Sequence, residues 1–436
     1  MILQWFKRQF QKKQPILSAA CQIIPRKEHG ISRQDIAENA LKVLYRLHKK
    51  GYQAYLVGGG IRDLLLQVPP KDFDIVTNAT PDQIRHLFRN CRLIGRRFRL
   101  AHVFFGKDII EVATFRSAHE TSGTDMAHQS DAGVLLRDNV YGKTIEEDVR
   151  RRDFTLNALY YNIADFSIVD CVGGLKDIQT GTLRLIGDPE TRYREDPVRM
   201  LRAIRFAAQR NLHLHPDTAQ PIAALSHLLT HVAAARLFEE LHKLFLKGKS
   251  IETFHALQKS GLFPYLFPSV TRALDLNPEC LRLIEATLIS TDNRLKQGKP
   301  VILAFVLCGL LWWPILQRKK SHYPHEKSLT GFEYAMNDIW KEQNQVIHIP
   351  RRIQEMCTEI WFLQAKLTSS RQHRAHTLLT ERRFRAAYDF LCLRADSGEK
   401  VHTAAQFWTA FQETDDLVAH PHLNPPPRSG GRDKQR

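Results

Sequence analysis

The stretch AYLVGGGIRDLLLQVPPKDFDIV, residues 54–76, decides the fold of this chain. It predicts a short apolar strand over Ala54–Val57, a turn of glycines, and a helix over Ile61–Gln67 that stops before two prolines. A second strand is expected over 72–76, where apolar residues follow the letters DFD. Strand, turn, helix and strand in this order indicate an α/β unit.

Downstream of this unit the pattern changes from strands to helices. Two further strands are expected at Leu100–Phe105 and Ile109–Phe115, followed by a mobile loop over Ser117–Gly133 that has no periodicity. Helical patterning resumes beyond Thr144, and after Gly187 most of the remaining chain to about Asp416 is expected to be helical. The sequence therefore predicts an α/β head followed by a long all-α region.

The composition limits the classes of partner and of cross-link. The chain has 436 residues, with 63 Lys+Arg against 46 Asp+Glu and a formal net charge of +17, so a partner that carries phosphates is expected. Its seven cysteines are scattered and never form a Cys-x-x-Cys pair, which argues against a disulfide framework and a zinc ribbon. A reducing cytoplasm fits this usage best.

Membrane association has two candidate segments. The run Val301–Leu316 has only 16 residues, short of the roughly 20 that a bilayer span needs, so a buried helix is expected there. The basic N-terminus, Met1–Lys27, contains no cleavable signal pattern. It leaves open a peripheral association with membranes.

Asp72 and Asp74 are the first candidate catalytic pair. Residues two apart on a strand project from one face, so these carboxylates would repel each other unless a cation lay between them. In phosphoryl-transfer sites such carboxylates hold two Mg²⁺ ions. A solvated strand edge or turn would contain the same isolated pattern.

The glycine turn at Gly58, Gly59 and Gly60 favours a metal site over a solvated strand edge or turn. Glycines let the backbone approach a triphosphate closely, and Arg62 in the first turn of the following helix suits a phosphate. The turn lacks the full spacing of a dinucleotide-binding loop and the Lys-Ser/Thr of a P-loop, and a plain tight turn is the alternative. We interpret the turn as one that delivers a triphosphate to the nearby aspartates.

Four motifs follow one another along the first half of the chain. They are LVGGGIRD (56–63), KDFD (71–74), RRDFTLNA (151–158) and EDPVRMLRAIRF (195–206). Together they resemble the class II tRNA nucleotidyltransferase and bacterial poly(A) polymerase family. Two more stretches, LIGRRFRLAH (93–102) and FRAAYDFL (384–391), resemble the poly(A) polymerase branch rather than the CCA-adding branch.

The resemblance implies a fold and an activity. The fold would be an α/β nucleotidyltransferase head with a small mixed, polymerase β-like sheet, followed by an all-α neck, body and tail region. The enzyme would be a cytoplasmic polynucleotide adenylyltransferase that adds AMP from ATP to RNA 3′ ends without a template, by a two-metal mechanism releasing pyrophosphate. A CCA-adding tRNA nucleotidyltransferase and a non-catalytic RNA-binding protein are the alternatives. The expected divisions are a basic N-terminal extension (1–31), the head (32–186), a neck with base-recognition helices (187–250), a helical body and RNA-binding region (251–417) and a disordered tail (418–436).

The resemblance also implies roles for the motif residues. Asp72 and Asp74 would bind Mg²⁺ and act as catalytic residues together with Asp153. The residues that would bind the nucleotide are Gly58, Gly59, Arg62, Arg152, Asp196, Arg199, Arg202 and Arg205.

The spacing inside the last motif agrees with a single binding surface. Asp196 and Arg199 are three residues apart, and Arg202 and Arg205 continue at the same step. All four therefore share a broad helical face, although a solvated charged helix would have the same pattern. Glu111, in an apolar strand, either faces solvent or points into the site as a third metal ligand.

Two basic clusters are candidates for RNA contact. Arg96, Arg97 and Arg99 form one in the head, and the stretch Arg351–Arg385 has eight basic residues against three acids, with aromatic residues between them. This composition suits a surface that binds the RNA backbone. A solubilising face would explain each arginine equally well.

Overall fold

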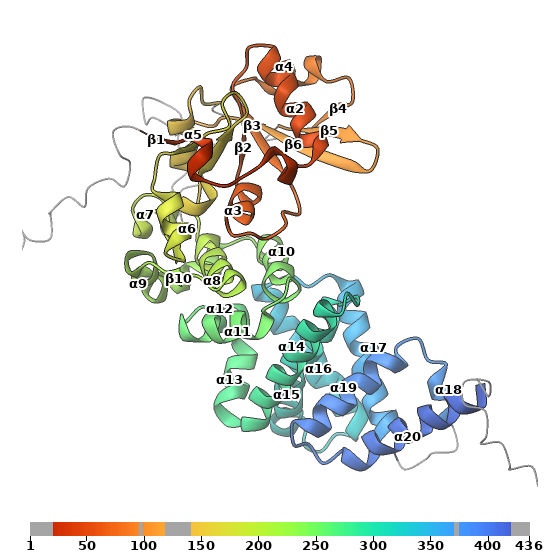
Figure 1. The fold of residues 1–436 in the computed structure, drawn as a ribbon. Helices are drawn as coiled ribbons and strands as arrows, with labels where there is room; N and C mark the ends of the chain where they lie inside the picture. The colour runs from red at the N-terminus through yellow and green to blue at the C-terminus, as the bar shows by residue number, and fades with distance from the viewer. Residues whose placement is uncertain (1–20, 96–98, 118–140, 370–374, 420–436) are drawn as a thin grey trace, which may run out of the picture. The chain divides into compact units, whose positions relative to one another are not determined.

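The computed structural model describes residues 21–95, 99–117, 141–369 and 375–419. The chain divides into two compact units, Met1–Val232 with Ala256–Leu262, and Ala233–His255 with Phe263–Arg436. The first unit contains the sheet and the second is helical (Figure 1). The expected fold class, a mixed-sheet head followed by a largely helical region, is confirmed. The finer division into five domains stays a prediction.

The first unit is built on a mixed sheet, in which the described residues form eight strands in the order β1-β8-β7-β2-β3-β6-β5-β4. Among these strands β3 and β6 run parallel, and the other neighbours are antiparallel. The strands are β1 (Gln22–Ile24), β2 (Ala54–Val57), β3 (Asp74–Thr77), β4 (Cys91–Ile94), β5 (Leu100–Phe105), β6 (Asp108–Thr114), β7 (Leu159–Asn162) and β8 (Ile168–Asp170).

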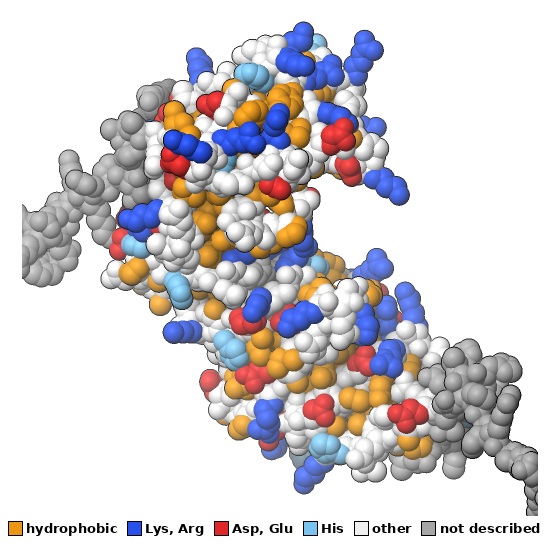
Figure 2. Space-filling model, viewed as in Figure 1, with side chains coloured by type: hydrophobic (Ala, Val, Ile, Leu, Met, Phe, Trp, Pro, Cys, Tyr) orange, Lys and Arg blue, Asp and Glu red, His pale blue; other side chains and the backbone are white. Residues whose placement is uncertain are grey.

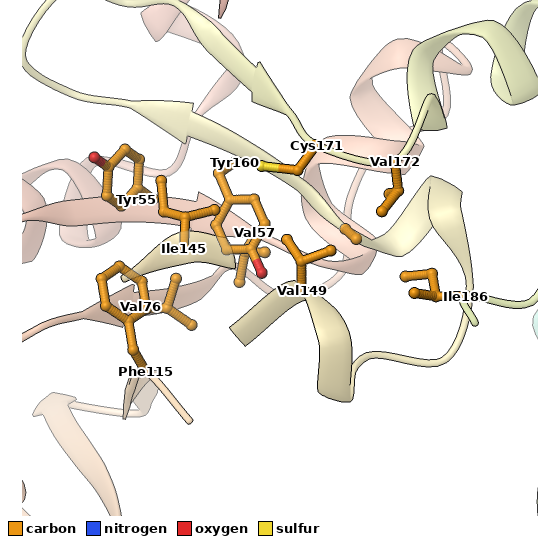
Figure 3. Close-up of a cluster of buried hydrophobic side chains, with 11 residues drawn as sticks. Tyr55, Val57, Val76, Phe115, Ile145, Val149, Tyr160, Cys171, Val172 and Ile186 are labelled. Atoms are coloured by element: carbon orange, nitrogen blue, oxygen red, sulfur yellow. The ribbon is translucent and has the colours of Figure 1, made fainter. Parts of the chain in front are cut away.

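Helices cover both faces of this sheet. On one face, Val57 and Val76 pack with Ile145 and Val149 of α5 (Ile145–Arg151) in a buried cluster (Figure 3). The intervening strand residues point to the other face. There α2 (Glu38–Lys49), an amphipathic helix whose apolar side is buried, packs against β2, β3 and β6.

The remaining helices belong partly to the first unit and otherwise form the second. Short 3₁₀ helices lie at Arg26–Glu28, Arg33–Asp35, Thr155–Asn157 and Ser226–His231, and a small parallel pair joins β9 (Thr182–Leu183) to β10 (His213–Leu214). The other helices are α3 (Gly59–Leu65), α4 (Pro81–Leu87), α6 (Gly174–Gln179), α7 (Pro189–Glu195), α8 (Val198–Arg210), α9 (Pro216–Leu225), α10 (Ala234–Phe245), α11 (Ser250–Lys259), α12 (Phe263–Leu266), α13 (Pro268–Leu276), α14 (Pro278–Lys296), α15 (Leu303–His322), α16 (Ser328–Val346), α17 (Arg351–Thr368), α18 (Ala375–Leu379), α19 (Phe384–Asp396) and α20 (His402–Ala419).

The observed strands correct the sequence prediction in two places. β2 and β5 lie where expected and β6 begins one residue earlier. The helix expected directly after Thr144 is α5, but the two strands that follow it, β7 and β8, were missed. These strands have only four and three residues, and β7 is buried almost throughout, so neither contains an alternation that sequence reasoning can detect. β1 and β4 were also missed, and β1 lies inside the expected N-terminal extension.

One disulfide contradicts the inference drawn from the scattered cysteines. Cys21 is bonded to Cys171, 150 residues away. The two meet because β1 pairs with β8 in a register that places Gln22 opposite Asp170. The spacing of the cysteines along the sequence does not indicate this pairing. The free cysteines of the described chain are Cys91, Cys280, Cys308, Cys357 and Cys392.

The apolar run over 301–316 forms a buried helix, as predicted. It is the first part of α15, whose residues from Leu303 to Ile315 are mostly buried. None of the helices that the structure describes has the length and apolar character needed to cross a bilayer. The expected loop beyond Ser117, Arg96 and Arg97, the first 20 residues and the tail from 420 lie outside the described residues.

Candidate active site

Asp74 and Glu111 are neighbours on the sheet. The parallel register of β3 and β6 pairs Ile75 with Val112, so the preceding residues of the two strands also lie side by side, on the opposite face. The pKa of Asp74 is raised to about 6, mainly by burial and next by the charge of Glu111, while Arg152 opposes the shift. The carboxylates are therefore close enough to repel each other.

Asp72 lies just before β3, although the sequence pattern predicted that it lies on this strand. β3 begins at Asp74, opposite Val57, the last residue of β2. Because the chain turns away at Gly58, no β2 residue is left to pair with Asp72. Its charge nevertheless contributes to the raised pKa of Asp74. The two aspartates thus share a site, although the alternation of side chains on a strand is not the reason.

The glycine turn lies directly against these aspartates. Gly58 has φ +75°, a left-handed conformation that glycine adopts without strain, and a Cβ placed on it would be 3.5 Å from Oδ2 of Asp74. A Cβ on Gly60 would be 3.1 Å from the carbonyl oxygen of Asp72. The turn is therefore in contact with both aspartates: Gly60 is tightly packed against the backbone of Asp72, and at Gly58 the positive φ is what favours glycine.

Arg62 is buried and bonded inside the protein. Its guanidinium donates to Oδ1 of Asp63 at 2.7 and 2.9 Å and to Oδ1 of Asn157 at 2.8 Å. A Cβ on Gly59 would be 3.4 Å from Nη2 of Arg62, so the guanidinium lies next to the turn. Asp63 also accepts a bond of 2.9 Å from Arg210 of α8.

Asp153 is held by groups from two other parts of the first unit. Its Oδ2 pairs with the guanidinium of Arg202, with Nε at 3.0 Å, and its Oδ1 accepts from Asn157 at 3.2 Å and from the backbone N–H of Phe154 at 2.8 Å. Burial alone would raise the pKa of Asp153, but Arg202 and these hydrogen bonds hold it below its usual range. Asp153 is therefore kept ionised.

Arg152 points to the face of the sheet that carries Asp74. It donates to Asp148 at 2.9 Å and to the hydroxyl of Tyr160 at 2.8 Å, and its guanidinium lies 5.2 Å from the centre of the Tyr160 ring. Burial lowers the pKa of Arg152, but Tyr160 and Asp148 more than offset that effect, so its pKa lies above the ordinary value. Its positive charge is thus permanent.

The predicted residues of α8 divide into two groups. Arg202 and Arg205 lie over the ring of Phe206, at 5.4 and 4.3 Å, and Arg62 approaches the same ring at 5.2 Å. Arg199 instead bonds the carbonyl of Arg192 at 2.8 Å and Glu195 at 3.0 Å. Asp196 follows α7 in an extended conformation and lies outside α8, so the prediction that it shares one helical face with the three arginines was wrong. Its Oδ1 accepts from the N–H of Val198 at 3.2 Å.

The two other candidates have partners on the sheet and at the surface. Glu111 is paired across the antiparallel β5–β6 register with His102, whose Nε2 lies 3.6 Å from Oε1. Arg99 forms a two-pronged ion pair with Asp82 at 3.0 and 3.2 Å. Sequence reasoning missed the residues that hold the site together, namely Asp63, Asp148, Asn157, Tyr160, Phe206 and Arg210. Asp63, Asn157 and Phe206 lie within the quoted motifs, which was the available signal.

Comparison with known proteins identifies the family. Three protein-family models match: the poly(A) polymerase head domain over residues 54–184, the probable RNA and SrmB-binding site of polymerase A over 211–274, and the arginine-rich C-terminus of polymerase A over 325–436. Poly(A) polymerase I of Salmonella typhimurium is 50% identical over 415 residues, covering 93% of this chain and 89% of that enzyme. The chain belongs to the bacterial poly(A) polymerase family. The resemblance read from the four motifs is confirmed.

Similarity to CCA-adding enzymes is weaker and shorter in sequence. The CCA-adding enzyme of Bacillus subtilis is 37% identical over 227 residues, 52% of this chain and 55% of that enzyme. The solved structure of the Bacillus stearothermophilus CCA-adding enzyme in complex with CTP has a TM-score of 0.58 and 25% identity, covering 88% of this chain and 82% of that one. This poly(A) polymerase family member therefore shares the fold of both branches and is a nucleotidyltransferase.

Proposed function

We propose that this chain adds AMP from ATP to RNA 3′ ends without a template, in RNA processing and turnover in the cytoplasm. The observation that carries the proposal is the packing of the glycine turn against Asp72 and Asp74, since it brings a triphosphate-sized anion and carboxylates to one place. Similarity to poly(A) polymerases along nearly the whole chain supports adenylate addition over CCA addition, for which the sequence similarity spans about half of it.

Mg²⁺ fits the donors that this site offers. Asp72, Asp74 and Glu111 supply only oxygen ligands, and the pKa of Asp74 is raised first by burial and then by the charge of Glu111, which Arg152 only partly offsets. Within the described residues no group of three His, Cys, Asp or Glu side chains, these three carboxylates included, is arranged to hold a metal ion by itself. This agrees with Mg²⁺, which takes one or two carboxylates and completes its shell with substrate phosphates and water. Bound there, Mg²⁺ would neutralise the phosphates and lower the pKa of the RNA 3′ hydroxyl.

Different residues around the carboxylates would bind the triphosphate, the ribose and the base of ATP. Gly58, Gly59 and Arg62 would contact the triphosphate, because the turn allows close approach and Arg62 lies beside it. Arg152, on the face that carries Asp74, would add a second positive charge, and Asp153 would bind the ribose. The residues that would read the base and support this surface are Asp196, Arg199, Arg202 and Arg205.

The reaction needs little covalent chemistry from the protein. The RNA 3′ oxygen forms a bond to the α-phosphorus while the bond from that phosphorus to the bridging oxygen of pyrophosphate breaks, and the hydroxyl proton is lost to solvent. Positioning of the triphosphate by the turn and by the arginines is what these residues contribute.

RNA contact through Arg96, Arg97, Arg99 and the stretch 351–385 stays a prediction. Arg99 is paired with Asp82. In the second cluster Arg351, Arg383 and Arg385 each pair with a carboxylate nearby, which neutralises part of its charge. Salt-dependent RNA binding would therefore draw on the other basic residues of that stretch as well.

Primer extension with each nucleotide separately tests the function. The acceptors are a generic RNA and a tRNA that ends before CCA. Long tails made from ATP alone on the generic RNA are the expected result. Addition confined to the tRNA, with CTP used before ATP, would replace the proposal by CCA addition. RNA binding without pyrophosphate release would favour the non-catalytic alternative.

A further inference from the structure

α2 carries a basic groove that none of the proposed steps uses. This α2 groove has a volume of about 1000 Å³ and is lined by five cations, Arg33, Lys42, Arg46, Lys49 and Lys50. It lies on the opposite side of the sheet from the carboxylates, because α2 packs on the face that carries Ile75 and Val112, whereas Asp74 and Glu111 point the other way. Figure 2 shows Lys and Arg side chains gathered on the head.

The positive charge of the groove is not balanced locally. Glu38 is the one acid among the residues that line it, and Glu38 pairs with Lys42 at 2.8 Å. Lys42 and Arg46 are four residues apart on α2, as are Arg46 and Lys50. Like charges at this spacing repel each other, which opposes the favourable interaction of cations with the C-terminal end of a helix. A polyanion in the groove would remove the repulsion.

Aromatic side chains accompany these cations. Tyr45 and Phe105 line the groove and are partly exposed, while Arg46 lies over the buried ring of Phe88 at 5.2 Å. Cations that follow a backbone, together with aromatic faces on which bases stack, are the two components of single-strand binding surfaces. An acidic protein partner would need the cations but not the exposed rings.

The groove also begins near the strand that contributes to the site. Asn39, in the first turn of α2, donates to Asp108 at 3.1 Å, and Asp108 begins β6 three residues before Glu111. At about 3.4 Å per residue, roughly 10 Å of β6 separates the start of the groove from the level of Glu111. A strand leaving the site can therefore reach α2 around the end of the sheet.

We propose that the α2 groove binds a single-stranded segment of the RNA substrate upstream of its 3′ end. This inference rests on the proposed function. It predicts that RNA long enough to reach the groove is bound more tightly than a short primer that fills only the active site.

The test compares two double variants of the full chain. Lys49→Gln/Lys50→Gln removes two cations at the C-terminal end of α2, and Lys143→Gln/Lys176→Gln removes two exposed cations elsewhere in the first unit, outside the segment 211–274 that matches an RNA-binding model. Fluorescence anisotropy, without ATP or Mg²⁺, measures the Kd of a 20-nucleotide and of a 5-nucleotide oligoadenylate across a salt series.

The groove variant should bind the 20-mer roughly five-fold or more weakly, and the slope of log K against log salt should fall by about 1.4, which is 0.7 for each lost phosphate contact. Binding of the 5-mer and both affinities of the control variant should not change. An unchanged Kd and slope for the 20-mer would overturn the inference, as would an equal loss in the control. Binding of polyglutamate that the groove variant abolishes, with RNA affinity intact, would also overturn it and indicate an acidic protein. This binding measurement needs no catalysis. A failure of the proposed function would appear only in the primer-extension assay and is therefore distinguishable from a failure of this inference.

Discussion

Asn157 accepts a hydrogen bond of 2.8 Å from Nη1 of Arg62, although the two residues are 95 positions apart in the sequence. The amide of the same Asn157 donates to Asp153 at 3.2 Å. One side chain therefore connects the arginine beside the glycine turn with the carboxylate that α8 holds through Arg202. Asn157 is a positioning residue for both groups.

Replacement of Asn157 by alanine should harm both stability and catalysis. The change leaves Nη1 of the buried Arg62 without its partner, so the free energy of unfolding should fall by about 1–3 kcal/mol. A loosened Arg62 and Asp153 should lower kcat/KM for ATP roughly 100-fold. Urea denaturation and steady-state extension measure the two effects. Asn78→Ala, which removes a surface bond to the backbone of Gln53, is the control and should leave kcat/KM unchanged; an equal loss there would contradict a positioning role.

The aspartate pair should separate activity from stability. Asp74→Asn and Asp72→Asn should each lower extension roughly 1000-fold. In EDTA, however, Asp74→Asn should raise the free energy of unfolding by about 1–3 kcal/mol, because it removes a half-buried charge that Glu111 repels. Asp72 is exposed, so Asp72→Asn should change stability by less than about 0.5 kcal/mol. Activity retained in either variant would refute the metal assignment.

The ion pair between Arg202 and Asp153 should make stability depend on pH. The pKa of Asp153 is lower in the folded protein than its ordinary value, so the pair stabilises the fold above about pH 4 and this contribution is lost as the pH falls through the folded-state pKa. Arg202→Gln should therefore cost roughly 2 kcal/mol at pH 7, and the Tm values of variant and wild type should converge below about pH 4. Arg194→Gln breaks an exposed pair with Glu190 and should cost less than about 0.5 kcal/mol. A constant gap from pH 3 to pH 7 for Arg202→Gln would argue against this assignment.

The bond between Cys21 and Cys171 should stabilise the first unit under oxidising conditions. It closes a loop of 150 residues and holds β1 against β8 at the edge of the sheet. Cys21→Ser should therefore lower the free energy of unfolding by roughly 2–4 kcal/mol without reductant and have little effect with it. Thermal unfolding of both proteins with and without dithiothreitol measures this. Identical melting under both conditions would mean that the cross-link does not contribute to stability.

Much of the head could be read directly from the sequence. The run AYLV, four apolar residues between a helix end and three glycines, favours a short buried strand, and β2 lies at Ala54–Val57 as predicted. The four motifs likewise identified the family, because each preserves side chains whose chemistry depends on their local spacing. β7 and β8 could not be read in this way, since strands of three or four buried residues contain no period.

The candidate site was predictable in its members but not in its connections. Asp72 and Asp74 were identified as a pair, yet the reason given, a shared strand, was wrong, because β2 ends opposite Asp74. Nothing near Arg62 in the sequence indicates that Asn157 binds it, or that Phe206 lies beneath its guanidinium.

The sequence by itself determined the α/β head, the helical remainder, the family and the residues that carry the chemistry, because all of these depend on neighbours a few positions apart. The tertiary structure alone decided that Glu111 lies beside Asp74, that Cys21 meets Cys171, and that cations line a groove on α2 away from the carboxylates. Those relations depend on strand order and register, and the pairing of β3 with β6 or of β1 with β8 becomes defined only when segments distant in the sequence pack into one sheet.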